Sequence, residues 1–121
     1  MTPQTSASRV AAESTTTFIA SREAASFVIT VSGDLDYVAV EGAALSSVLS
    51  SYRSNEPLDV VFDLEGVTFL DSAGLGWLMG VRAAATLASR RVRMRRSSAS
   101  VDSVLDMTQL KRYFPAESVP Q

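Results

Sequence analysis

The chain has 121 residues, 46% of them hydrophobic and 20% charged, which is enough for one globular domain to bury a core without metals or disulfides. Its 11 basic and 13 acidic residues give a net charge of -2, so the overall charge favours neither nucleic acid nor a membrane surface as a partner. The sequence has no Cys and no His, which excludes thiol catalysis, cysteine metal sites and a Ser-His-Asp triad.

The start of the chain shows no targeting signal. Residues 1–14 lack the basic start and the apolar core of a signal peptide, and we interpret them as a disordered tail before a single domain at residues 15–121. The longest apolar run, at residues 73–81, is far too short to span a bilayer. These features, with the missing Cys, predict a cytoplasmic protein whose partner is another protein or a small molecule.

Three apolar segments have the pattern of strands. Residues 17–20 and 26–32 predict two strands, and the short link between them predicts a hairpin. Residues 58–64 are bulky and apolar on both faces, as in a central parallel strand that is covered on both sides. In the second strand, the residues expected on one face are Phe27, Ile29 and Val31.

Helices are predicted between and after these strands. Residues 37–53 show helical spacing, a second helix begins at Ser72, and a short third helix covers residues 100–108. Residues 90–97 alternate apolar with basic side chains, as in a further strand. The buried face of the first helix is expected to hold Val38, Leu45, Leu49 and Tyr52, and that of the second Leu75, Leu78, Val81, Ala85 and Ala88. The order predicts one α/β domain, a mixed sheet of four to five strands packed by three or so helices.

The stretch FLDSAGLG places an Asp and a Ser between the central strand and the second helix. Asp and Ser are preferred at helix N-caps, where they contribute about 1 kcal/mol, and capping alone accounts for Asp71. It does not account for Gly74, Gly76 and Gly80, each of which costs up to ~1 kcal/mol in a helix relative to Ala. The glycines indicate either close packing on the sheet or an exposed surface, poor in side chains, around Ser72.

A phosphate group would suit Ser72, because a helix N-terminus presents free N–H groups and a positive potential to an anion. Phosphorylation there is expected to leave the fold intact. The added charge, about −1.5 to −2, would repel acidic groups of a partner and would be costly to bury. The junction therefore predicts a binding surface that can be switched.

Two stretches resemble one known family. DLEGVTFLDSAGLGWLMG at residues 63–80 resembles the signature of STAS-domain anti-sigma factor antagonists, and ITVSGDLDYVAVEGAAL at residues 29–45 is similar to the strand, Gly-x-Leu-Asp turn and helix that precede it. The resemblance covers about residues 17–115 and implies a STAS-like fold. The chain ends at Gln121, where the family usually continues into a closing helix, so a domain shortened at the C-terminus is expected, either a monomer or a weak homodimer.

The resemblance also implies a function. In such proteins the Ser after the Asp is phosphorylated by a partner that is both an anti-sigma factor and a serine kinase, and the unphosphorylated form binds that partner and frees a sigma factor. Carried onto this chain, it implies Ser72 as the phosphoacceptor, ATP bound by the kinase, a phosphatase as a further partner, and no enzyme activity, metal or cofactor of the chain itself. The implied binding surface comprises Asp36, Asp71, Ser72, Ala73, Gly74 and Gly76.

Within this surface, the resemblance implies that Asp71 orients the Ser72 hydroxyl and that Gly74 and Gly76 keep the surface open. Ala73 stands where many members have a second Ser, which leaves Ser72 as the only hydroxyl of the motif. Trp77 occupies a place more often held by a smaller aliphatic residue, and we favour a core role for it over a place in the binding surface.

Other charged residues receive a structural interpretation. The five arginines at residues 90–96 are interpreted as the solvated face of an edge strand rather than as a site for phosphate groups or nucleic acid, because no aromatic residues are interleaved and the net charge is negative. Asp63 and Glu65 are interpreted as solvated charges at a loop end rather than as metal ligands.

Two other classes of function stay open. STAS domains also serve as docking or accessory subunits of transporters and of stress-sensing complexes, in which the Ser has no switching role. A hydrolase built on Ser72 would need an activating group other than His, and Lys111 is the only lysine in the chain.

Overall fold

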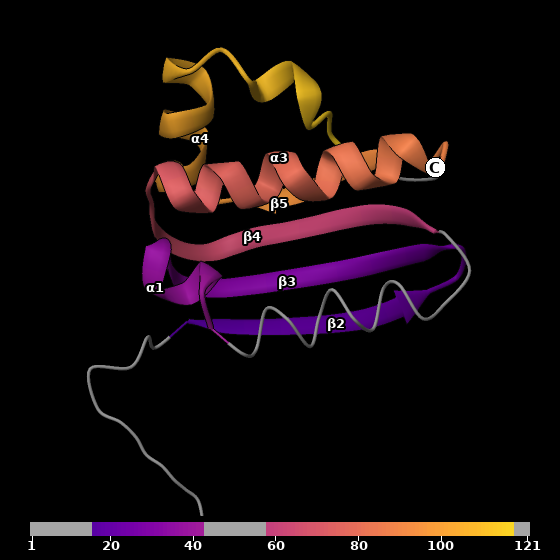
Figure 1. The fold of residues 1–121 in the computed structure, drawn as a ribbon, viewed down its shortest axis with the longest axis horizontal. Helices are drawn as coiled ribbons and strands as arrows, with labels where there is room; N and C mark the ends of the chain where they lie inside the picture. The colour runs from indigo at the N-terminus through magenta and orange to yellow at the C-terminus, as the bar shows by residue number, and fades with distance from the viewer. Residues whose placement is uncertain (1–15, 43–57, 118–121) are drawn as a thin grey trace, which may run out of the picture.

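The computed structural model of the chain describes residues 16–42 and 58–117, and the predicted tail lies outside them. A four-stranded sheet in the order β2-β3-β4-β5 forms its centre (Figure 1). β2 (Thr17–Glu23) pairs antiparallel with β3 (Ser26–Leu35), whereas β4 (Asp59–Leu70) runs parallel to both β3 and β5 (Val92–Ser97). The predicted mixed sheet with a central parallel strand is confirmed.

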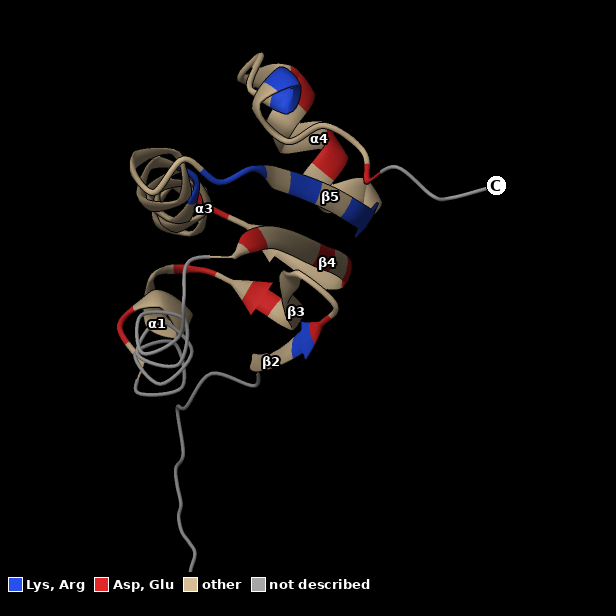
Figure 2. Ribbon diagram, turned by 90° about the vertical axis from the view of Figure 1, so that its right-hand side faces the viewer, with Lys and Arg blue, Asp and Glu red and all other residues tan. Residues whose placement is uncertain are grey.

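Helices cover both faces of this sheet (Figure 2). α1 (Tyr37–Val40) and α3 (Ser72–Leu87) lie on one face, and α4 (Ala99–Met107) lies on the other. A short 3-10 helix, η1 (Lys111–Tyr113), follows α4. Within the described ranges, four strands packed by three α-helices agree with the predicted α/β architecture.

The hairpin between β2 and β3 forms as predicted. Its register pairs Glu23 with Ser26, and Ala24 in the turn between them adopts a φ of 53°. β3 then extends beyond the predicted strand to Leu35, past a shift in its pairing with β4. Gly33 lies at that shift with a φ of 93°, a backbone conformation that residues with a Cβ rarely adopt.

The predicted first helix is described only over its first turn. α1 ends at Val40, and Leu45, Leu49 and Tyr52 lie outside the described residues. Val38 was expected on the buried face, but its side chain is 50% exposed, and Ala39 is the buried residue of α1. The prediction for Val38 is wrong because this single turn packs inward through the small Ala39 side chain.

One hydrophobic core joins the sheet to α3 and α4, and Trp77 is part of it. The Trp77 ring packs edge-to-face against Phe18 at 5.6 Å and against Phe62 at 5.7 Å between ring centroids. Only 8% of the residue is exposed, so the predicted core role is confirmed. Its indole Nε1 is buried without a hydrogen-bond partner in the described part of the chain. The larger fully buried side chains include those of Ile29, Leu35, Phe62, Leu64, Leu78 and Leu105.

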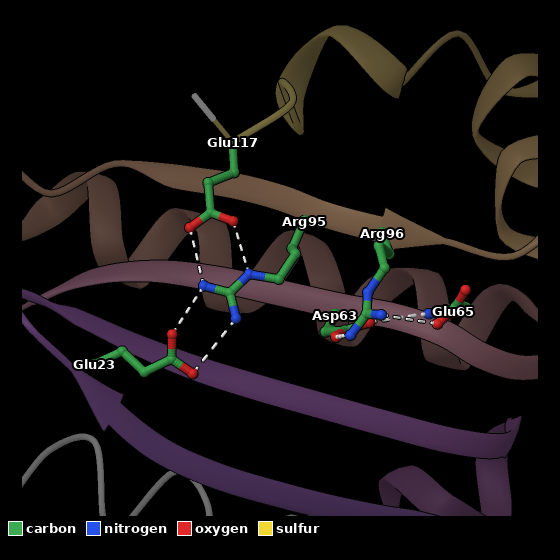
Figure 3. A network of polar contacts seen from close by, with 6 residues as sticks. All are labelled: Glu23, Asp63, Glu65, Arg95, Arg96 and Glu117. Atoms are coloured by element: carbon green, nitrogen blue, oxygen red, sulfur yellow. Dashed lines mark hydrogen bonds and ion pairs between the residues drawn. The ribbon is translucent and has the colours of Figure 1, made fainter. Parts of the chain in front are cut away.

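A bulge in β5 changes the surroundings of Asp63. Phe62 pairs with Met94 and Asp63 with Arg96, so Arg95 is the extra residue on β5. Asp63 is only 5% exposed, and its carboxylate forms an ion pair with Arg96, which also contacts Glu65 at 3.2 Å (Figure 3). The interpretation of Asp63 as a solvated loop charge is therefore wrong: β4 continues to Leu70, and the bulge brings Arg96 to its carboxylate.

Arg95 connects the two edges of the sheet. Its guanidinium contacts Glu117 at 2.7 Å and Glu23 of β2 at 3.0 Å, reaching across the central strands (Figure 3). Glu117 also donates its backbone N–H to the carbonyl of Met94, so the segment after η1 lies along the outer edge of β5. β5 occupies the edge position as predicted, but Arg95 and Arg96 are ion-paired rather than merely solvated.

Candidate functional site

The site lies where β3 and β4 end side by side. Because the two strands are parallel, their last residues, Leu35 and Leu70, are paired in the register. Each strand is followed by one Asp and then by a helix, with Asp36 before α1 and Asp71 before α3. The Gly-x-Leu-Asp and Asp-Ser-x-Gly-Leu motifs therefore meet at one end of the sheet.

The two Asp side chains cap the helix starts. Asp36 accepts the N–H of Ala39 at 3.0 Å, and Asp71 accepts the N–H of Gly74 at 2.9 Å, each contribution being about 1 kcal/mol. The second oxygen of Asp71 accepts the N–H of Tyr37, the first residue of α1, at 3.1 Å. One carboxylate therefore joins the starts of both helices.

Gly74 brings the start of α3 against β3. A Cβ at this position would lie 2.1 Å from the carbonyl oxygen of Leu35, so only glycine fits without a shift of the backbone. Gly76 and Gly80, in contrast, have open space where a Cβ would stand. Close packing therefore explains Gly74, which is buried and does not keep the surface open as expected. Gly76 is exposed and fits that expectation.

Ser72 is exposed at the first position of α3. Across residues 16–42 and 58–117, no hydrogen bond of its hydroxyl is found, and the expected orienting contact from Asp71 is absent. Both oxygens of Asp71 instead hold backbone N–H groups. The Ser72 hydroxyl is thus accessible beside a fixed carboxylate, and Ala73 next to it is half-buried.

Carboxylates gather around this end of the sheet (Figure 2). Asp34 accepts a hydrogen bond from the Thr68 hydroxyl at 2.7 Å, and its carbonyl accepts another from the Thr16 hydroxyl. Together with Asp36 and Asp71, it gives the strand ends an acidic character before any modification. A further anionic group there adds to charge that is already present.

Exposed apolar side chains lie beside the capped helix starts. The exposed fraction is 63% for Tyr37, 50% for Val38 and 51% for Phe69. Sequence reasoning missed Tyr37 and Phe69 as surface residues. Two features of the sequence indicate this exposure. Tyr37 directly follows the N-cap Asp36, and Phe69 precedes Leu70, which points inward, so that Phe69 faces the other way.

Other chemistries find little support in the described residues. In these ranges no group of three or more His, Cys, Asp or Glu side chains is placed to hold a metal. The ammonium of Lys111, considered as an activator of Ser72, contacts Asp106 of α4 at 3.7 Å. No helix in the described part of the chain is long and apolar enough to cross a membrane.

Comparisons with known proteins agree with this geometry. The family model described as "STAS domain" matches residues 18–120. The fold is similar to that of the anti-sigma factor antagonist SpoIIAA in its unphosphorylated form, with a TM-score of 0.69 and 20% identity over 84% of this chain and 88% of that chain. It is also similar to an anti-sigma factor antagonist from Mycobacterium paratuberculosis, with a TM-score of 0.67 and 24% identity over 91% of this chain and 92% of that chain. 

At these identities the structural likeness establishes the fold. A search of curated proteins found no match. The family model, in contrast, spans nearly all of the described residues and includes both motifs that meet at the strand ends. The chain belongs to the STAS domain family.

Proposed function

We propose that the chain is an anti-sigma factor antagonist that acts by partner switching in the cytoplasm. In its unphosphorylated form it binds an anti-sigma factor serine kinase, and the sigma factor held by that kinase is released. The kinase uses its own ATP to phosphorylate Ser72, which ends the interaction, and a phosphatase restores the binding form. The chain is then a substrate and a ligand rather than an enzyme.

The observation that carries this proposal is the state of Ser72. Its hydroxyl is exposed and makes no hydrogen bond within the described ranges, while the neighbouring Asp71 is fixed by two backbone N–H groups. A kinase can reach such a hydroxyl without unfolding the start of α3. The likeness to two anti-sigma factor antagonists supports the same assignment.

The surface around Ser72 has the features of a docking site. Tyr37 and Val38 offer exposed apolar area in the first turn of α1, and Gly76 leaves room for a partner's backbone. Tyr is enriched among residues that dominate binding energy at protein interfaces. We expect the unphosphorylated surface to bind through these side chains, with Asp36 and Asp71 holding them in position.

Phosphorylation would change this surface rather than the fold. A phosphate on Ser72 adds about −1.5 to −2 of charge next to Asp71, and its burial against a partner would be strongly unfavourable. The N-terminus of α3 tolerates the same charge, because the helix dipole favours anions there. Binding is therefore lost while the domain stays folded.

The test is an affinity pull-down from native cell extract with four baits. Wild type and Ser72→Ala are expected to recover an ATP-binding kinase, whereas Ser72→Glu, an imperfect phosphate mimic, is expected to lose it. Ser103→Glu is the matched control, since Ser103 is an exposed residue of α4, on the opposite face of the sheet, and its substitution adds the same charge. Kinase should be recovered with this control.

A different result would select the other function. If all four baits recover the same proteins, Ser72 is only the first residue of a capped helix and the switch is refuted. The chain would then act as a docking or accessory subunit of a transporter or stress-sensing complex. The exposed Tyr37, Val38 and Phe69 would serve that role without any modification.

A further inference from the structure

A basic cleft lies at the other end of α3. It has a volume of about 210 Å³ and is formed by the second half of α3, the start of β5 and η1. Figure 2 shows basic residues in the link before β5, along β5 and on the segment after α4. The charged and aromatic side chains of its wall are Arg82, Arg90, Arg91, Arg93, Arg112 and Tyr113.

The cleft arginines have no neutralising partner among the residues that the structure describes. Within residues 16–42 and 58–117, none of the five forms an ion pair with a carboxylate. Arg95 and Arg96, which follow Arg93 on β5, each contact two carboxylates (Figure 3). A chain with a net charge of -2 thus gathers around one hollow five cations that are unpaired in its described part.

Two of these arginines are held in place by Tyr113. Arg82 lies over the ring, 4.5 Å from its centroid, and its Nε donates to the Tyr113 carbonyl at 3.2 Å. Arg112 lies 5.0 Å from the same centroid and donates to the Tyr113 hydroxyl at 3.2 Å. That hydrogen bond, followed by the positive charge of Arg112 and then that of Arg82, lowers the pKa of Tyr113. The cleft therefore has a positive potential.

Helix electrostatics account for only part of the cluster. Arg90 and Arg91 follow the last turn of α3, where cations interact favourably with the negative end of the helix dipole. This effect does not explain why Arg82 and Arg112 share one aromatic ring, or why Arg93 faces the same hollow. Like charges held close together repel each other, and a bound anion would offset that repulsion.

We propose that this cleft binds a small phosphate-bearing anion of about the size of pyrophosphate. Planar guanidinium groups donate pairs of hydrogen bonds that match phosphate oxygens, and two of them are already oriented by Tyr113. The volume is below the roughly 300–1,000 Å³ of sites for drug-sized ligands, so the occupant has few atoms beyond its phosphates. A single hollow of this size also suits a compact anion better than a nucleic-acid backbone.

The proposed anion site is separate from Ser72. α3 has 16 residues. Arg82 is the first α3 residue of the cleft and follows Ser72 by ten positions, which is roughly 15 Å along the helix at 1.5 Å per residue, so an anion of the size of pyrophosphate cannot contact both sites. The anion site therefore goes beyond the proposed partner switch, and either can fail without the other.

Isothermal titration calorimetry of the full chain with inorganic pyrophosphate at low salt tests the proposal. One binding event per chain is expected, tighter than that of inorganic phosphate. Arg82→Gln and Arg112→Gln should each weaken binding about tenfold, as expected for the loss of a charge-assisted hydrogen bond. Arg90→Gln should weaken it as well, and within residues 16–42 and 58–117 that side chain forms no hydrogen bond or ion pair that the substitution would remove.

Arg22→Gln is the matched control. Arg22 is an exposed residue of β2, at the opposite edge of the sheet, and its substitution removes the same charge. Binding by this variant and by Ser72→Glu should equal that of wild type. The proposal is overturned if no binding is detected with pyrophosphate at up to about 10 mM, because a specific site would have a lower dissociation constant than that. Equal weakening by Arg22→Gln, or tighter binding of a single-stranded oligonucleotide, would also overturn it.

Discussion

The carboxylate of Asp71 accepts hydrogen bonds from two different helix starts. One oxygen caps α3 at Gly74, and the other accepts the N–H of Tyr37 at the start of α1. A cap needs only one acceptor, so the second bond explains why Asp, with two equivalent oxygens, is better suited here than Asn.

A graded substitution series at Asp71 tests this double role. Asp71→Asn keeps one acceptor and should lower the free energy of unfolding by about 1 kcal/mol, whereas Asp71→Ala loses both bonds and should cost about 2 kcal/mol. Urea denaturation measures both values. Asp36→Ala, which removes a single cap bond, serves as the reference for one lost contact. Equal losses for the Asn and Ala variants would show that the Tyr37 bond contributes nothing.

The glycines of α3 differ at the residue scale, and Ala substitution separates them. Gly74→Ala places a Cβ against the Leu35 carbonyl and should destabilise the domain by about 1–3 kcal/mol. Gly80→Ala meets open space and should stabilise it by up to about 1 kcal/mol. Thermal unfolding of the two variants gives the comparison. A Gly74→Ala protein as stable as Gly80→Ala would mean that the close approach to β3 is not required.

At the scale of elements, α3 is anchored through one aromatic side chain. Trp77 packs between Phe18 of β2 and Phe62 of β4, although its indole N–H is unpaired in the described ranges. Trp77→Phe keeps an aromatic ring and removes this donor, so it should cost about 1 kcal/mol or less. Trp77→Ala leaves a large cavity and should cost about 3–5 kcal/mol. Chemical denaturation measures both, and a similar loss for the two variants would contradict this packing role.

The segment after η1 is held on β5 by an interaction that depends on pH. Hydrogen bonds from Arg95, more than charge attraction alone, lower the pKa of the Glu117 carboxyl below its ordinary value. Because the folded state favours the ionised form, the stabilisation is complete above the ordinary Glu pKa and is lost as the pH falls through the lowered pKa.

Glu117→Gln should therefore reduce stability by up to about 1 kcal/mol at neutral pH, and the difference from wild type should shrink towards zero in acid. Unfolding measured across the acid range checks both parts of this expectation. Glu41→Gln is the control, since Glu41 is an exposed residue at the end of α1. If the difference in unfolding free energy between wild type and Glu117→Gln does not change with pH, the ion pair is excluded as its cause.

Sequence patterns predicted most elements, because their apolar periodicity is local. The alternation in β3, the run of bulky residues in β4 and the capped start of α3 each needed only a few neighbouring residues. The length of β4 and the burial of Asp63 were not predictable in this way. The length of β4 depends on its pairing with β3, which continues to Leu35 and Leu70, and the burial of Asp63 depends on a bulge in β5 that pairs it with Arg96 instead of Arg95. No local pattern in these strands shows either register.

At the scale of the whole molecule, the proposed switch acts on a surface and not on the fold. Phosphorylated Ser72 should leave the circular dichroism spectrum unchanged and the melting temperature equal to or slightly above that of the unmodified chain, because α3 presents its positive end to the phosphate. Chain phosphorylated at Ser72 and unmodified chain can be compared directly. A large drop in melting temperature would show that phosphorylation acts by unfolding.

The candidate site was only partly predictable from sequence. The position of Ser72 and its Asp neighbour followed from the motifs, since a strand and a helix flank them directly. The link from Asp71 to Tyr37 and the exposure of Tyr37 and Phe69 were not predicted, because they arise where two segments far apart in the chain meet. The basic cleft was missed for the same reason, as α3, the link before β5, β5 itself and η1 all supply its arginines.

The shared carboxylate of Asp71 also sets a condition for protein engineering. Transplanting the phosphoacceptor loop at residues 70–76 into another scaffold would carry the Ser but leave one oxygen of Asp71 without its N–H donor. It would also leave Gly74 without the Leu35 carbonyl, against which it packs closely. The smallest portable unit is therefore discontinuous: it joins residues 33–40 to residues 70–76, with their two parallel strand ends side by side.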